Sequence, residues 1–554
     1  MSTKEIRPKG ENFVWFTGMG LALGLLMVFA LLAVIFVNGI TVFWPKEIVE
    51  VRLKEGSDAE IQGAEAFAGY ISIDRHVNDI RPGKVEQKRE LQFFVGNKDV
   101  YGFMYKFVDY DQIESMGPTP GIIELERLEY GDAIGYPVSL TLKDGTKISV
   151  GDENFEKEFE EFFKAAQDRR KEIRHLEKKV IGRINHKMTQ LQVKKRTLER
   201  KHGDEAAQAM SSYIKYDDEI AELQVDYDKL AAEAKALRQE QHDIQFTYRL
   251  ATGQEQSLPM GELTGYYYPD RLGFFGKITF FVSHLWDFVS ENPREANTEG
   301  GIFPAIFGTF VMTLLMSIAV MPFGVLAAIY LREYAKQGAF VRAIRIAINN
   351  LAGVPSIVYG VFGLGFFVYV LGGTIDDLFF SSRLPTPTFG TGGILWAALT
   401  LALMTVPVVV VATEEALSAV PRGMREASLA CGASKWQTIQ RIVIPAAAPG
   451  MLTGLVLAMA RGAGEVAPLM LVGVVKLAPA LPIDGIFPYV HLERKFMHLG
   501  FHIYDLGFQS PDSEAAKPMV FATTLLLIVL VVLLNLSAII IRNKLKKRYK
   551  VGAF

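Results

Sequence analysis

Long uncharged stretches alternate with charged ones along this chain. Asp, Glu, Lys and Arg are absent from stretches that each exceed the roughly 20 apolar residues a helix needs to cross a bilayer: 12–45, 300–331, 346–375, 384–413 and 518–541. The stretch 442–475 is apolar apart from Arg461 and Glu465. The pattern therefore predicts six membrane-spanning helices. The first stretch is too long for a signal-peptide core and lacks a small-residue cleavage site, so we expect it to be a retained anchor.

The region between the first two spans has a different pattern. Short alternating or β-branched runs between 48 and 150, and again between 246 and 268, predict β-strands. From 155 to about 245 the pattern is helical. The apolar residues from Tyr213 to Ile244 follow an unbroken 3–4 spacing, the seam of a coiled coil, and those from Ile173 to Leu198 a looser one. This pattern predicts an antiparallel coiled-coil hairpin that turns near His202 and Gly203. The hairpin is interpreted either as a docking arm for a partner protein or as a stabilising rod.

A further amphipathic helix is expected at about 273–290, just before the second span. Its apolar face comprises Phe274, Ile278, Phe281, Leu285 and Phe288. The segment is short for a span and carries ionisable groups elsewhere, so the pattern favours a helix that lies in the membrane interface.

The charged residues are distributed unequally between two regions of the chain. Residues 46–299 hold 36 Lys or Arg and 47 Asp or Glu, whereas the remaining 300 residues hold 23 and 14. With both termini inside, 17 Lys or Arg of the termini and short connections lie on the cytoplasmic side and five on the other, which is the usual bias. We therefore predict an all-α polytopic membrane protein, N-terminus and C-terminus cytoplasmic, with an inserted periplasmic β-rich domain.

The expected division of the chain follows from these patterns. It has a cytoplasmic N-terminus with the first span (1–45), the insertion (46–299), a core of five further spans (300–541) and a basic tail (542–554). The tail and the N-terminal Lys4, Arg7 and Lys9 contribute to the predicted orientation.

Catalytic and metal-binding motifs are absent from the sequence. It has no phosphate loop of the type that binds nucleotides and no His-Glu-x-x-His motif. Cys431 is the only cysteine, and His491 and His498 are expected at surface or interfacial positions rather than in a metal site. The chain is therefore expected not to be an enzyme and to need no cofactor, so any energy supply must come from another chain.

The stretch 414–445 is the most informative connection. Its residues Glu426, Ala427, Ser428, Gly432, Ile442 and Pro445 stand at matching spacing, and the stretch resembles the coupling loop of ABC importer permeases. Glycine permits a sharp turn after a short helix, and Pro445 is expected to start the next span. The resemblance implies that the short helix docks onto a separate ATP-hydrolysing subunit.

Other stretches resemble the phosphate importer permeases of the PstA type. They are 324–331, 350–360 and 460–468, although Gly462 and Val466 replace the Ala and Thr usual in that family. The resemblance implies the ABC importer permease fold in a bacterial inner membrane. It also implies as partners a homologous second permease, an ATPase dimer and a periplasmic phosphate-binding protein. The insertion departs from the compact members.

Arg461 and Glu465 are the expected centre of the substrate path. If the fifth span starts near Pro449, Arg461 lies near the bilayer centre with Glu465 on the same helix face. A charge there is costly unless the path is polar, and a guanidinium suits an oxyanion because its planar fork donates two hydrogen bonds. The alternative is an internal ion pair that locks two helices. Weaker candidates for lining the path are Asn350, Ser356 and Thr405.

The sequence thus predicts one half of a phosphate importer. The alternatives are a permease for another oxyanion, such as sulfate or molybdate, and a membrane-anchored sensor that signals through its coiled coil. A sensor would need neither the 414–445 stretch nor an Arg–Glu pair within a span.

Overall fold

The computed structural model describes residues 11–81, 84–208, 210–511 and 513–548. The basic N-terminal residues and the end of the basic tail, 549–554, lie outside the described residues, so the orientation prediction is not addressed there.

Six helices of the described chain are long and apolar enough to cross a membrane, which confirms the predicted number. Their bounds are Phe13–Thr41, Phe303–Tyr334, Ser356–Phe379, Ile394–Ser418, Lys435–Gly464 and Ser513–Lys544. They include α1 (Glu11–Thr41), α8 (Phe303–Ile329), α10 (Ser356–Phe362), α11 (Gly373–Phe379), α12 (Ile394–Ser418), α14 (Lys435–Thr438), α15 (Ile444–Gly464) and α18 (Ser513–Arg548).

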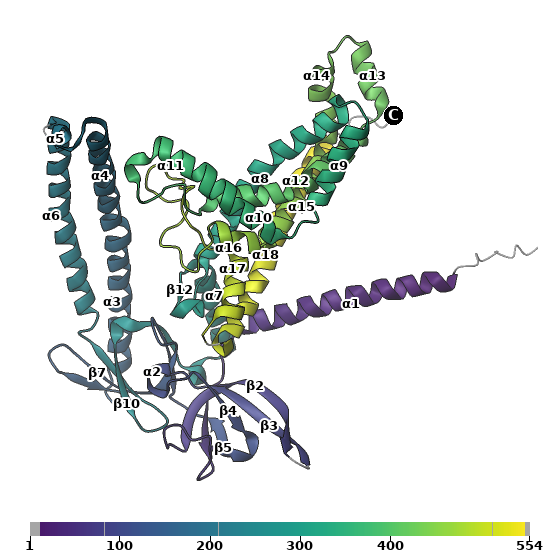
Figure 1. The fold of residues 1–554 in the computed structure, drawn as a ribbon. Coiled ribbons are helices and arrows are strands. Elements are labelled where there is room, and N and C mark those ends of the chain that lie inside the picture. Colours follow the sequence, from purple (N-terminus) through teal and green to yellow (C-terminus); the bar gives the residue numbers. More distant parts are fainter. Residues whose placement is uncertain (1–10, 82–83, 209, 512, 549–554) are drawn as a thin grey trace, which may run out of the picture.

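The spans α8, α12 and α15 form the centre of the bundle (Figure 1). They approach closely because small residues stand where they cross. A Cβ added to Gly324 of α8 would lie 2.6 Å from Val409 Cγ1, and one added to Gly454 would lie 2.7 Å from Ala412 Cβ. Such small-residue contacts let helix backbones pack tightly where lipid leaves no hydrophobic driving force.

The third span is shorter than its uncharged stretch. We expected it to include residues 346–355, but these belong to a separate helix, α9 (Ala339–Leu351), and the turn after it. The span begins at Ser356 because Pro355 lacks an N–H and restricts the residue before it.

Helix α1 diverges from the bundle along most of its length (Figure 1). Only its last turns pack against α18, where Gly39 faces Leu525 and Phe521. Apolar side chains such as Phe16, Leu26 and Phe29 are therefore exposed on all sides of α1. Such a helix is stable only when lipid or another apolar surface surrounds it.

The inserted domain (46–299) contains two antiparallel sheets at one end of the bundle (Figure 1). The first has the order β4-β3-β2-β1-β5, with β1 (Val49–Leu53), β2 (Ala66–Arg81), β3 (Lys84–Phe94), β4 (Tyr105–Asp109) and β5 (Ile113–Pro118). The second has the order β10-β9-β7-β6-β11 with β8 on β7. Its strands are β6 (Ile123–Arg127), β7 (Ala133–Thr141), β8 (Lys147–Ser149), β9 (Gln245–Arg249), β10 (Glu255–Pro259) and β11 (Leu263–Tyr267).

These strands follow the period of two that the sequence shows. In β1, Val51 and Leu53 are buried and Arg52 between them is exposed. Both sheets contribute to one core, in which Phe67, Leu125 and Phe246 are fully buried. Shorter elements are α2 (Lys98–Tyr101), β12 (Pro293–Arg294) and β13 (Glu299–Gly300). None of the strand-like runs between 48 and 150 covers β5, because Ile113–Pro118 combines a glycine, a proline and only two large apolar residues.

A long helical hairpin leaves the second sheet after β8 and returns at β9 (Figure 1). One arm consists of α3 (Phe155–His175), a wider π-helical segment at Leu176–Ile181 and α4 (Gly182–His202). The other consists of α5 (Asp204–Gln208) and α6 (Ser211–Glu240). The chain turns at Gly203, whose φ of +80° favours glycine. Coiled-coil packing of the arms remains a prediction, although the predicted seam residues from Tyr213 to Ile244 are all buried or half-buried.

The base of the hairpin belongs to the core of the inserted domain. Phe155, Phe159 and Ala166 are buried with the strands, and Arg170 donates hydrogen bonds to the carbonyl oxygens of Gly261 and Leu263. Above this base the arms contact each other through ion pairs such as Lys187–Glu219 and Arg238–Glu177, both at 2.7 Å.

A deletion can separate these two parts of the hairpin. Replacing 177–236 by a short Gly-Ser linker is expected to leave the thermal unfolding of the inserted domain nearly unchanged, because the base is kept. Deleting 156–245 is expected to unfold the domain, since loss of a buried phenylalanine alone costs about 3–5 kcal/mol. Circular dichroism of both variants against temperature tests this, and equal stability of the two would contradict it.

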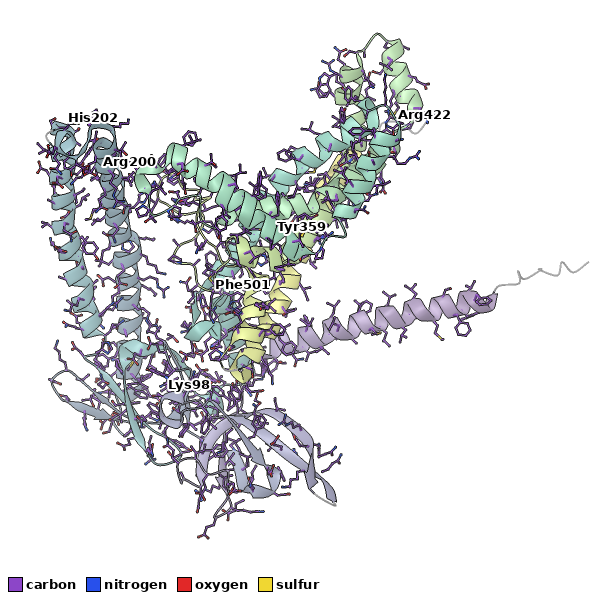
Figure 2. All side chains as sticks on the ribbon, viewed as in Figure 1. Lys98, Arg200, His202, Tyr359, Arg422 and Phe501 are labelled. Carbon is purple, nitrogen blue, oxygen red and sulfur yellow. The ribbon has the colours of Figure 1, made fainter. Side chains whose placement is uncertain are left out.

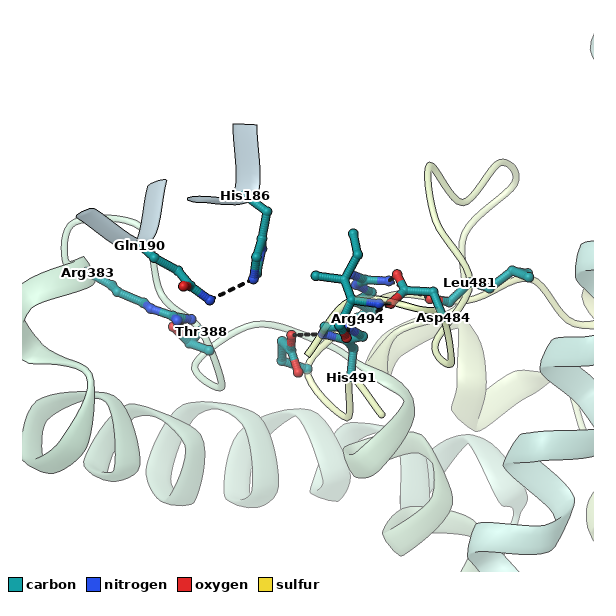
Figure 3. Close-up of polar contacts among 10 residues, drawn as sticks. His186, Gln190, Arg383, Thr388, Leu481, Asp484, His491 and Arg494 are labelled. Atoms are coloured by element: carbon teal, nitrogen blue, oxygen red, sulfur yellow. Dashed lines mark hydrogen bonds and ion pairs between the residues drawn. The ribbon is translucent and has the colours of Figure 1, made fainter. Parts of the chain in front are cut away.

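The tip of the hairpin contacts the core of membrane-spanning helices. Arg200 of α4 donates a hydrogen bond to the carbonyl oxygen of Ser381, in the connection between α11 and α12. Further along α4, His186 and Gln190 point toward the connections that carry Arg383 and His491 (Figure 3). The inserted domain thus reaches the spans at two separate places.

The other place is a cavity of about 370 Å³ between the domain and the ends of α1 and α18. It is lined by the carboxyl groups of Glu124, Asp132 and Glu299 and by the side chains of Trp44 and Met519. Burial, followed by the charge of neighbouring carboxylates, raises the pKa of Glu124 to about 8 and that of Asp132 to about 7. The same causes raise the pKa of Glu299 well above its ordinary value.

The contact between the inserted domain and the ends of α1 and α18 is expected to become less stable as the pH rises; we call this contact the joint. The raised pKa values mean that the three carboxyl groups bind protons when the joint is closed and release them when it opens and water reaches them. Its stability is therefore full below the ordinary carboxyl pKa and is lost as pH rises through the raised values, up to about pH 8. Each group contributes at most about 1.4 kcal/mol per pH unit.

Hydrogen exchange in β6 and β11, corrected for intrinsic rates, measures this opening. Glu124→Gln keeps an acceptor for the Tyr267 hydroxyl, which bonds to Glu124, and is expected to flatten the pH dependence. An opening free energy that stays constant or increases from pH 5 to pH 8 would refute the prediction.

Candidate functional site

The stretch 414–445 contains two short helices, α13 (Arg422–Ala430) and α14, joined by a tight turn, at the end of the bundle opposite the inserted domain (Figure 1). We call this helix–turn–helix unit the α13 turn. Helix α13 begins after Pro421, and Arg422 marks its start in Figure 2. Gly432 then takes a φ of +83°, which confirms the predicted sharp turn. The hydroxyl of Ser434 caps the next helix in a reciprocal pair with Gln437.

Side chains within the bundle hold α13 in place. Arg425 donates hydrogen bonds to the carbonyl oxygens of Leu417 and Val420 and to Glu333, at 2.6–2.9 Å. The hydroxyls of Ser428 and Thr438 bond each other at 2.9 Å and join α13 to α14. The contact between Arg425 and Glu333 was not predicted from the sequence, because charged residues in a connection between spans have no distinctive spacing.

The opposite side of this turn is exposed. Glu426, Ala427 and Gly432 are all exposed, as are the large apolar side chains of Met424, Leu429 and Trp436. Exposed apolar residues clustered on a fixed helical turn are typical of a surface that docks onto a protein. Ile442 and Pro445 lie behind it, half-buried in the helix that follows.

Pro445 does not start the fifth span, contrary to the expectation. The helix runs from Lys435 through Ile439–Val443 into α15 without interruption. Pro445 has no N–H to donate, and the turn before it widens into a π-helical segment, Ile439–Val443, that continues the helix.

Arg461 and Glu465 are brought together, although not as expected. The helix α15 ends at Gly464, and Glu465 is extended with φ −82° and ψ 132°, so the two residues do not share a helix. Glu465 Oε1 lies 3.6 Å from Arg461 Nε, and the side chains are 23% and 34% exposed. Arg461 therefore lies in the last turn of its helix, not in the middle of a continuous span.

The end of α15 is closely packed around this pair. A Cβ on Gly462 would lie 2.3 Å from the sulfur of Met316, so a larger residue here would have to displace the end of that flexible side chain. After Glu465 the chain forms the short helix α16 (Ala467–Val472), which packs on α10 at Gly360. On α10, the hydroxyl of Tyr359, in the middle of the bundle in Figure 2, donates to the carbonyl oxygen of Leu351 at 2.7 Å.

The weaker path candidates lie in different environments. Asn350 is exposed at the end of α9, and Ser356 is half-buried at the start of α10. Thr405 is fully buried in α12, and its hydroxyl donates to the carbonyl oxygens of Leu401 and Ala402. The structure therefore places Ser356 on a helix that contacts the segment after Glu465, and Thr405 in the packed interior.

The two histidines expected at the surface are buried. His491 is 3% exposed and contacts Asp484 and Glu493 at 3.1 and 3.3 Å, whereas His498 is fully buried and accepts a hydrogen bond from the N–H of Gly500. They stabilise the connection between the fifth and sixth spans, which also contains α17 (Leu499–Tyr504). Within the described residues, no group of three or more His, Cys, Asp or Glu could hold a metal ion.

Comparison with known proteins assigns the membrane core. Residues 320–551 match the family model of the binding-protein-dependent transport system inner membrane component. The probable ABC transporter permease protein YqgI of Bacillus subtilis is 31% identical over 265 residues, 46% of this chain and 83% of its own. The phosphate transport system permease protein PstA 1 of Mycobacterium tuberculosis (strain H37Rv) is 35% identical over 253 residues, 46% of this chain and 73% of its own. The chain belongs to the PstA-type ABC transporter permeases.

A further relative and a solved structure also match this permease. The probable ABC transporter permease protein YqgH of Bacillus subtilis is 34% identical over 37% of this permease and 62% of its own length. A solved structure of the MetNI methionine ABC transporter is 18% identical and covers 44% of this permease and 94% of that chain, with a TM-score of 0.33. That score is too low to support an inference. The matched family region does not include the inserted domain of the permease.

Proposed function

We propose that this permease is one half of the membrane path of an ATP-driven importer of inorganic phosphate. The similarity to PstA permeases over most of their length carries the proposal. A homologous second permease would complete the path, and a periplasmic binding protein would deliver phosphate to it. The family is a membrane component of transporters, so ATP hydrolysis is assigned to a separate ATPase dimer.

The α13 turn is the proposed contact with the ATPase. Its exposed side carries Glu426 and Ala427 beside Leu429, and its other side is fixed to the bundle by Arg425. A movement of the ATPase would therefore pass through α13 to α12 and to Glu333. Ser428, Gly432, Ile442 and Pro445 shape this turn rather than contact the ATPase directly.

Arg461 is the proposed phosphate contact within the path. Its guanidinium has no hydrogen bond among the described residues, and the 3.6 Å to Glu465 is too long for a strong one. Its donors are therefore free to bind an oxyanion, while Glu465 balances the charge between transport events. Ser356 and Asn350 are proposed as secondary lining residues. Thr405 is retained as a weaker proposal, because its hydroxyl already bonds to its own helix.

The proposed setting is a bacterial inner membrane with both termini in the cytoplasm. This orientation places Arg422, Arg425 and Lys435 of the ATPase contact on the cytoplasmic side and the inserted domain on the periplasmic side. It agrees with the Lys and Arg bias of the short connections.

Uptake into proteoliposomes tests the function. Vesicles that contain both permeases and the ATPase, with the binding protein outside and ATP inside, are expected to accumulate labelled phosphate. Sulfate and molybdate uptake in the same vesicles is expected to stay at the level without ATP. ATP-dependent uptake of either anion without phosphate uptake would replace phosphate as the substrate, and hydrolysis with no uptake of any oxyanion would refute the proposal.

A further inference from the structure

The helix α7 (Phe274–Ser290) has one face that none of the described residues covers. Six of its large apolar side chains are exposed, with Phe275 at 82%, Trp286 at 67% and Val282 at 57%. The others are Phe274, Ile278 and Leu285. At about 100° per residue these six fall within roughly 120° of the helix circumference, so they form one continuous stripe.

Contacts with the inserted domain fix the rotation of α7 about its axis. His284 Nε2 lies 2.6 Å from Glu126 Oε1, and the ring of Phe280 lies 4.4 Å from that of Tyr267. Phe288, near the end of α7, is 4% exposed and packs with Ile302 and Met519. The apolar stripe therefore points away from the domain and cannot turn inward without breaking these contacts.

The stripe differs from the one expected from the sequence. Phe281 and Phe288 were expected on the membrane face, but their rings pack against Phe43, at 6.5 and 4.9 Å. The exposed stripe is rotated away from them toward Phe275, Val282 and Trp286. Sequence periodicity could not show this, because α7 is apolar over more than half of its circumference.

The position of α7 relates the stripe to the membrane. Phe43 and Trp44, which contact α7, directly follow the first spanning helix α1. The N–H of Ile302 donates to the carbonyl oxygen of Phe288 at 2.8 Å, and the second span begins at Phe303. The C-terminal half of α7 therefore lies where two spans leave the membrane.

The chemistry of the stripe favours lipid over a protein partner. All residues of α7 are described, and its ionisable side chains, Lys277, His284 and Asp287, lie outside the stripe. The stripe offers no hydrogen-bonding group except the indole N–H of Trp286, whereas a protein interface carries about one hydrogen bond per 100–200 Å². Tryptophan is enriched at the boundary between lipid chains and water.

We infer that α7 lies in the membrane interface with the stripe Phe274, Phe275, Ile278, Val282, Leu285 and Trp286 among the lipids of the leaflet next to the inserted domain. The helix thereby attaches the inserted domain to the bilayer surface beside the bundle. The attachment is independent of the transported anion, because none of these residues belongs to the proposed path.

Fluorescent labels on single cysteines test this. In a Cys431→Ser background, which removes the only cysteine, a dye is attached at Phe275→Cys or Val282→Cys in the full-length permease in lipid nanodiscs. The matched controls are Ser283→Cys, next to Val282 but outside the stripe, and Ala221→Cys on the exposed side of α6. Each label is exposed in turn to nitroxide-bearing lipids and to aqueous iodide.

Labels at 275 and 282 are expected to be quenched several-fold more by nitroxide lipids than by iodide, and the label at 221 to show the reverse. The label at 283 is expected to fall between them. Equal iodide quenching at 275, 282 and 221 would overturn the inference. Protection of 275 and 282 from both quenchers would also overturn it, since a protein would then cover the stripe.

Discussion

Phosphate uptake is expected to fall roughly tenfold or more when Arg461 is replaced by lysine, in a complex that still assembles. Lysine keeps the positive charge but loses the planar fork that can donate two hydrogen bonds to one oxyanion. A hydrogen bond to a charged group contributes about 1.5–3 kcal/mol, and about 1.4 kcal/mol is tenfold. Arg461→Gln is expected to reduce uptake further, because Glu465, at 3.6 Å, would then present an unopposed negative charge.

The double variant Arg461→Gln with Glu465→Gln separates a substrate contact from a structural ion pair. If Arg461 binds phosphate, the double variant remains inactive although its membrane yield and assembly are normal. If the pair only joins the end of α15 to the segment after it, the two amides can bond each other and uptake recovers. Phosphate uptake and complex yield, measured for all three variants, decide the question, and substantial recovery in the double variant refutes the substrate contact.

Gly432→Val is expected to abolish coupling while leaving the permease inserted in the membrane. The φ of +83° at this position disfavours any residue with a Cβ by about 1–2 kcal/mol, and a β-branched residue is disfavoured more. An added Cβ meets no atom of the described residues within 4 Å, so the effect comes from backbone conformation and not from a clash. The turn between α13 and α14 must then rearrange, and the ATPase contact with it.

A matched set of variants isolates this cause. Gly423 lies within α13, where φ is ordinary, and a Cβ there also meets open space. Gly423→Val therefore adds the same side chain without the strain and is expected to retain most uptake. Gly432→Asn, which tolerates the left-handed region, is expected to lie between the wild type and Gly432→Val. The ratio of phosphate taken up to ATP hydrolysed measures coupling, and a normal ratio in Gly432→Val would contradict the proposed docking surface.

The sequence predicted those parts of the fold that one local physical requirement determines. The six spans follow from the thickness of the hydrocarbon layer, and the sharp turn at Gly432 follows from a backbone conformation that favours glycine. The 3–4 spacing from Tyr213 to Ile244 predicted which side of α6 is less exposed.

Other features depend on contacts that a single sequence does not contain. The end of α15 at Gly464 sets the geometry of Arg461 and Glu465, and it is coupled to the packing of α16 on α10. The ion pairs Arg425–Glu333 and Arg345–Glu414 join residues 92 and 69 positions apart. The break after Gly464 has a local signal in Pro468, four residues later, which cannot donate to the carbonyl oxygen of Gly464. The distant pairs leave no such signal and become visible only in the folded structure.

The contact between Arg200 and Ser381 constrains how the molecule can move. The inserted domain is covalently joined to the first and second spans, and its hairpin reaches the connection between the third and fourth. A body fastened at two distant points cannot pivot freely about either one. If the first and second spans move away from the third and fourth, the hairpin must bend or its tip must detach from Ser381. The stiffness of the hairpin therefore opposes this movement.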